Sequence, residues 1–86
     1  MISINEMITA LQSLKADVYE VSSVIQREQV YINETVNKVH ANFSDQREGA
    51  DLIIGLHNAR NDLILADSAM YRVSQGLDET VNLLKQ

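Results

Sequence analysis

Apolar residues recur every seven positions along the first half of the chain. They are Ile4, Leu11, Val18, Ile25, Ile32 and Val39, and a companion row is formed by Met7, Leu14 and Val21. A strict seven-residue repeat keeps one stripe of a helix facing a partner helix. Ser3 and Glu6 fit a capping box at its start. The pattern therefore predicts a long helix over about residues 4–41.

The second half of the chain repeats the pattern. Its main row is Leu56, Leu63, Met70, Leu77 and Leu84, and its companion row is Leu52, Ala59, Ala66 and Val73. Asp45 and Glu48 have the spacing of a second capping box. The sequence contains no Pro, which favours uninterrupted helices because Pro is the strongest helix breaker. We therefore predict a second helix over about residues 46–84.

The stretch between the two rows has the composition of a turn. Asn42, Ser44 and Asp45 carry side chains that bond to nearby backbone groups and so favour caps and turns. A loop over about residues 42–45 is short enough to fold the helices back antiparallel. We predict an all-α fold in which residues 1–86 form a single antiparallel two-helix hairpin, with both heptad stripes facing each other.

Several apolar residues fall outside both stripes and predict a second interface. They are Ile53, Ile54, Ile64, Leu65 and Tyr71 in the second helix and Tyr19, Val30 and Tyr31 in the first. Two helices alone form a thin core, and small domains bury a low fraction of their surface. We expect the hairpin to pair with another helical protein, or with itself, and to complete a four-helix bundle by dimerisation.

Charge and hydropathy exclude several classes of partner. The net charge is −5, and the seven Lys and Arg residues are scattered along the chain. Nucleic acid and anionic membrane are poor partners for a chain without a basic stripe. The sequence has no apolar run long enough to span a membrane and no visible signal peptide. We expect a cytoplasmic protein, or one that a dedicated secretion machine exports.

Residues with the spacing of a catalytic or metal site are absent from the sequence. His40 and His57 are the two histidines, and their spacing matches no metal-ligand motif. There is no Cys, no Gly-rich phosphate loop and no recognisable activated nucleophile. The sequence therefore predicts a protein without catalytic residues, metal or cofactor, that is, not an enzyme.

The turn region, VHANFSDQREGADLIIGL, resembles that of the WXG-motif proteins of type VII secretion. Phe43 falls where the family has Trp, Ser44 and Asp45 follow where the family has x-Gly, and Gly49 lies close behind. The outline of an acidic hairpin without Cys resembles the family over nearly the whole chain. The resemblance implies a helix-turn-helix subunit of a bacterial type VII system that pairs into a four-helix bundle.

The resemblance also has departures. Phe43 replaces Trp and Asp45 replaces Gly. Family members commonly carry Tyr-x-x-x-Asp/Glu as an export signal, whereas here Tyr71 is followed by Gln75 and Tyr31 by Thr35. The chain is therefore also similar to the small accessory partners that bind the helical N-terminal domains of LXG toxins and help their folding, targeting or export.

The sequence pattern also fits other classes of helical protein. The chain is compatible with a small helical chaperone or needle-type subunit of another secretion system, and with a homodimeric coiled-coil adaptor. Phe43 has two interpretations as well. It closes the end of the hairpin seam as a buried ring, or it stays partly exposed as the aromatic element of a recognition surface beside Ser44 and Asp45.

Overall fold

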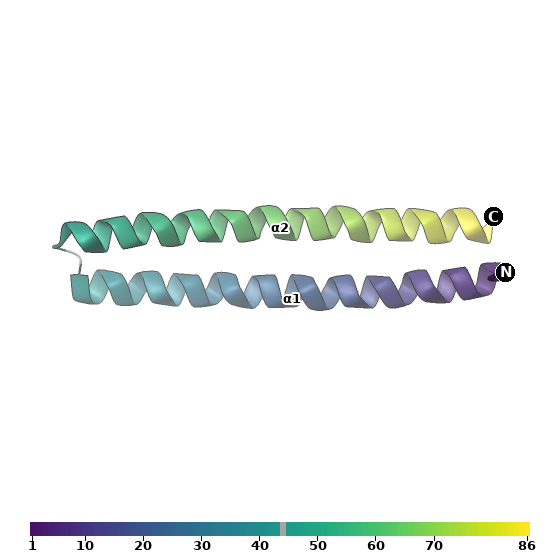
Figure 1. The fold of residues 1–86 in the computed structure, drawn as a ribbon, viewed down its shortest axis with the longest axis horizontal. Coiled ribbons are helices and arrows are strands. Elements are labelled where there is room, and N and C mark those ends of the chain that lie inside the picture. The colour runs from purple at the N-terminus through teal and green to yellow at the C-terminus, as the bar shows by residue number, and fades with distance from the viewer. Residues whose placement is uncertain (44) are drawn as a thin grey trace.

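The computed structural model, which describes residues 1–43 and 45–86, consists of two antiparallel helices (Figure 1). Helix α1 spans Ile4–Phe43 and helix α2 spans Arg47–Lys85. The molecule measures 63 × 18 × 14 Å, and both termini lie at the same end. The predicted all-α hairpin is confirmed. The role predicted for Ser44 in the turn lies outside the described residues.

The start of α1 is capped as the sequence predicts. The Oγ atom of Ser3 accepts a hydrogen bond of 3.1 Å from the backbone N–H of Glu6. The helix ends at Phe43, two residues later than expected. The side-chain amide of Asn42 donates to the carbonyl oxygen of Lys38 at 2.8 Å, so Asn42 belongs to the last turn of the helix.

The start of α2 differs from the prediction. The N-cap residue is Gln46, with extended backbone angles (φ −112°, ψ 142°) and no side-chain capping bond. The carbonyl oxygen of Gln46 accepts hydrogen bonds from the N–H groups of Gly49 and Ala50 at 3.1 and 3.3 Å, as expected of the residue at the cap. The capping box predicted for Asp45 and Glu48 is therefore wrong.

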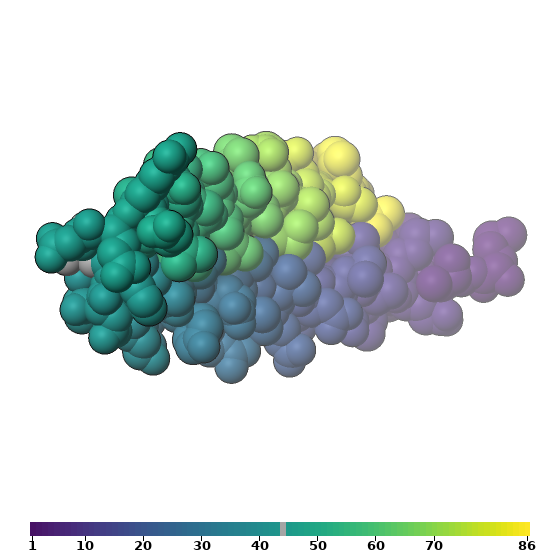
Figure 2. All heavy atoms as spheres, turned by 60° about the vertical axis from the view of Figure 1, so that its left-hand side comes forward, coloured from purple at the N-terminus to yellow at the C-terminus, as the bar shows by residue number. Residues whose placement is uncertain are grey.

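The main apolar row of each helix lies between the helices. From Leu11 to Val39 the row of α1 is buried or half-buried, and so is the row of α2 from Leu56 to Leu84. Figure 2 shows the two helices in contact along the molecule. Only Ile25, Val36 and Val39 are buried hydrophobic residues in the described parts of the chain. The core is thus a single thin layer.

Most residues of the companion rows lie outside the seam. Leu14, Val21, Leu52 and Val73 are between 45% and 53% exposed, whereas Met7 and Ala66 are half-buried. The seam instead uses the positions four residues after each main-row residue. These buried or half-buried residues are Ile8, Lys15, Ser22, Gln29 and Val36 in α1 and Arg60, Asp67, Ser74 and Val81 in α2, and the half-buried Ile53 lies one heptad before Arg60. The positions i+3 and i+4 flank a stripe on opposite sides, so the flank that packs on the neighbouring helix leaves the other flank largely exposed.

Candidate protein-binding surfaces

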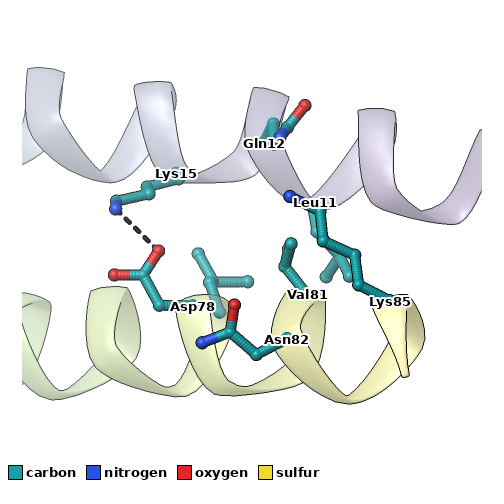
Figure 3. Close-up of a pocket in the computed structure, with 8 residues that line it drawn as sticks. Leu11, Gln12, Lys15, Asp78, Val81, Asn82 and Lys85 are labelled. Atoms are coloured by element: carbon teal, nitrogen blue, oxygen red, sulfur yellow. Dashed lines mark hydrogen bonds and ion pairs between the residues drawn. The ribbon is translucent and has the colours of Figure 1, made fainter.

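Polar pairs join the two helices along the seam. The Nζ atom of Lys15 lies 2.6 Å from a carboxylate oxygen of Asp78 (Figure 3). The hydrogen bond to Asp78 raises the pKa of Lys15 above its ordinary value of 10.5. The same ammonium group lies 5.9 Å from the centre of the Tyr19 ring, within the range of a cation–π contact.

Two further polar contacts cross the seam. The hydroxyl of Ser22 donates to a carboxylate oxygen of Asp67 at 2.7 Å, and the guanidinium of Arg60 donates to the side-chain oxygen of Asn33 at 3.0 Å. Each contact pairs a donor on one helix with an acceptor on the other. These contacts help to set the register of the hairpin, although the buried Nε atom of Arg60 has no hydrogen-bond partner.

Metal-ligating side chains do not cluster in the described residues, which contain no group of three side chains able to hold a metal ion. His40 is exposed and His57 is half-buried. Neither α1 nor α2, over the residues described, is long and apolar enough to cross a membrane.

Most residues of the predicted second interface are exposed. The exposed fraction ranges from 46% to 68% for seven of them, namely Ile54, Ile64, Leu65, Tyr71, Tyr19, Val30 and Tyr31. Ile53 differs, because it occupies the seam row of α2 and is half-buried. These residues do not form one surface. Tyr19 and Tyr71 line one shallow hollow, and Ile64 and Tyr71 line the next. We call Tyr19, Ile64 and Tyr71 the tyrosine face.

A second surface is made by the companion rows that the seam excludes. We define the apolar face as Leu14, Val21, Val24, Leu52 and Val73, which are between 45% and 53% exposed. Sequence reasoning missed this face because it assigned most of these residues to the seam. The heptad spacing was the available signal, since it marked Leu14 and Val21 in one helix and Leu52 and Val73 in the other as apolar positions beside the main rows.

The two helices contribute to the apolar face on the same side of the hairpin. An antiparallel helix pair has an approximate two-fold axis perpendicular to its plane, so equivalent heptad positions fall on one side. Tyr19 and Tyr71 each follow a main-row residue directly, and they do line one hollow. Leu14 and Val73 both lie three residues after a main-row residue, and they therefore share the opposite side.

Small residues line the α2 half of the apolar face. They are Gly55, Ala59, Ala66, Ala69 and Gly76. A Cβ atom added at Gly55 or Gly76 would meet no atom within 4 Å. Shallow hollows open beside Leu52 and Gly55 on α2 and beside Val21 and Val24 on α1. The face therefore leaves room for another helix to approach closely.

The turn motif is built around Gly49. This residue is buried, and a Cβ atom added to it would lie 2.8 Å from the Cβ of Phe43 and closer still to the Phe43 carbonyl group. Phe43 itself is 45% exposed, so its ring is not the buried plug that one interpretation predicts. Asp45 is exposed. The turn motif thus brings the end of α1 at Phe43 close to the start of α2 at Gly49.

Comparison of the chain with protein-family models, with curated proteins and with solved structures found no match. The resemblance to the WXG-motif proteins therefore stays a prediction from the sequence.

Proposed function

We propose that the hairpin is a non-enzymatic binding module that completes a helical bundle with another helical protein. The proposal rests on the solvent-exposed area of the hairpin. The chain exposes 6438 Å², whereas a compact monomer of its mass exposes about 5,100 Å². The excess of about 1,300 Å² is larger than the roughly 800 Å² that one partner contributes to a standard interface.

The distribution of apolar side chains supports the same proposal. In residues 1–43 and 45–86, three hydrophobic residues are buried and seventeen large ones are exposed. A core of this size supplies little stability by itself. A partner that binds the folded hairpin alone stabilises it by mass action. Binding would thus complete the fold as well as the assembly.

Type VII secretion is the setting that the sequence motif favours. The hairpin is proposed to pair with a toxin N-terminal domain or a related small hairpin and to help its folding, targeting or export. Support comes from the position of Phe43 at the end of α1, from the tight approach of Gly49 and from the acidic composition. The hairpin would act in the cytoplasm and either stay there or leave with its partner.

A pull-down from the native cell tests the proposal. The tagged chain should capture a helical protein at defined stoichiometry, measured by native mass spectrometry, with cross-links mapping to exposed rows of the hairpin. Deleting the gene should lower the secreted amount of that partner. A stable monomer of the 9.7 kDa chain that melts at high temperature and captures no helical protein would refute a binding role. Unchanged secretion of a captured partner would refute the type VII setting alone.

A further inference from the structure

The shape and charge of the apolar face indicate which kind of partner binds there. We infer that this face docks an amphipathic helix whose apolar stripe is bordered by Lys and Arg, and that a second copy of this chain is not its occupant. The inference rests on the proposed function, because it specifies where the partner binds and what it carries.

Shape is the first requirement for such a docking surface. Packed helices lie about 8–10 Å apart, and the shorter distances require small side chains at the contact. Gly55 and Gly76 have open space where a side chain would be, and Ala59 and Ala66 lie between them on the same side of α2. On α1 the larger Leu14, Val21 and Val24 form the other wall. The face therefore resembles a groove with one low wall.

Charge decides which helix fits. The hollow at Val21 and Val24 is bordered by Asp17 and Glu20, and the hollow at Leu52 and Gly55 is bordered by Glu48 and Asp51. Neither hollow is lined by Lys or Arg. Carboxylates thus border both ends of the groove at positions where a docked helix would place its flanking residues.

The heptad rows of the face add charge of the same sign. Glu28 continues the row of Leu14 and Val21, and Asp62 lies between Gly55 and Ala69 in the neighbouring row of α2. Among the basic residues, Lys38 continues the row of Asp17 and Val24, whereas Lys15 and Arg60 occupy the seam, where they pair with Asp78 and Asn33. The apolar face is therefore more acidic than the opposite side of the hairpin.

A second copy is a poor occupant for this reason. Docking two copies face to face would bring carboxylates from both molecules to the rim of one groove. Like charges brought together across an interface oppose binding and select against the wrong partner. A helix with Lys and Arg beside its apolar stripe is instead attracted by the carboxylates at the rim of the groove. The same attraction steers the helix toward the groove and makes binding faster.

Two model peptides test the inference. Both are amphipathic helices of about four heptads with the same Leu and Ile stripe and one Trp. One carries Lys and Arg beside the stripe and the other carries Glu. The chain itself has no Trp, so the peptide fluorescence reports binding alone. The basic peptide should bind at least tenfold more tightly at low salt. Its affinity should fall as salt rises, because the Debye length shrinks from about 30 Å at 0.01 M to 8 Å at 0.15 M.

Variants of the hairpin locate the bound peptide. Gly55→Leu combined with Gly76→Leu fills the groove, and should weaken basic-peptide binding at least tenfold without lowering the melting temperature, since both positions face open space. Asp17→Asn with Asp62→Asn should weaken binding and flatten its salt dependence. Ser68→Ala, at an exposed residue that lines the hollow of Ile64 and Tyr71 on the tyrosine face, is the control and should leave binding unchanged.

Several outcomes would overturn the inference. Equal binding of both peptides, or of neither, to a folded hairpin would exclude charge-based docking on this face. Loss of binding in Tyr19→Ala with Tyr71→Ala, but not in the glycine variants, would move the interface to the tyrosine face and leave the proposed function standing. A homodimer that strengthens with salt and is lost in the glycine variants would identify a second copy as the occupant.

Discussion

Replacing Gly49 by Ala tests the geometry of the turn. The added Cβ would lie 2.8 Å from the Cβ of Phe43 and closer to its carbonyl group. That carbonyl oxygen accepts the hydrogen bond from the N–H of Gln46. The atoms in the way are thus mostly backbone, and they belong to the link between the helices. The methyl group can be accommodated only if the end of α1 moves.

Two opposing effects determine how much Gly49→Ala changes the free energy of unfolding. Ala is favoured over Gly inside a helix by up to about 1 kcal/mol. Overpacking a close contact costs about 1–3 kcal/mol, and the cost is high when backbone must shift. We expect a net loss of about 1–2 kcal/mol in the free energy of unfolding, which for a chain of this size lowers the melting temperature by roughly 4–16 °C.

The other two glycines are matched controls. A Cβ at Gly55 or Gly76 meets no atom within 4 Å, so the propensity gain acts alone. Gly55→Ala and Gly76→Ala should each stabilise the isolated hairpin by about 0.5–1 kcal/mol. If the wild-type hairpin melts too low for measurement, Gly49→Ala can be introduced into the doubly stabilised background.

Thermal and urea melts followed by circular dichroism measure these differences. All proteins should be compared at one concentration, because assembly makes the melting temperature depend on concentration. If Gly49→Ala melts as high as Gly55→Ala, then Gly49 does not approach Phe43 as described and the proposed geometry of the turn is wrong.

Three further predictions follow from the seam and the helix ends. Leu63→Asp would place an unpaired charge between the helices and cost several kcal/mol, so circular dichroism should show loss of helix; an unchanged melt would exclude the register. Phe43→Ala should lower the free energy of unfolding measured in urea melts by about 1–2 kcal/mol. This is less than the roughly 3–5 kcal/mol of a fully buried ring, because the side chain is 45% exposed. A larger loss would mean that the ring is buried. Because Asp78 raises the pKa of Lys15 above 10.5, the stabilisation from this pair is present below pH 10.5 and is lost as the pH rises through the raised pKa. Urea melts at high pH should therefore show a steeper loss of stability in the wild type than in Asp78→Asn, and parallel curves would contradict the coupling.

The heptad rows predicted the two helices because helix formation follows local periodicity, and the short loop predicted their antiparallel pairing. The choice between the two flanks of each stripe depends on contacts across the chain. Apolar content favoured the flank with Leu14 and Val21, whereas the structure closes on the flank with Lys15 and Ser22 through contacts to Asp78 and Asp67. Those partners lie 63 and 45 residues away in sequence, so no local pattern marks them.

The sequence predicted only part of the exposed apolar surface, because the assignment of the seam decides which residues are exposed. Exposure of Ile64, Tyr71 and Tyr19 followed from their angle to the main stripe. Ile53 lies closer to that stripe and belongs to the seam that the sequence pattern did not identify. A row that packs in the seam cannot also be exposed. The apolar face could therefore be recognised only once the structure showed that the flank with Lys15 and Ser22, and not the flank with Leu14 and Val21, forms the seam.

The uneven placement of the buried residues has a consequence for how the hairpin opens. Ile25, Val36 and Val39 lie between the middle of α1 and the turn, whereas the half next to the termini is joined by the exposed Lys15–Asp78 pair. Amide hydrogen exchange should therefore be slowest near the turn and fastest at the termini, with opening that begins at the free ends. Folding should proceed in the reverse direction, since contacts near the turn close the shortest loops.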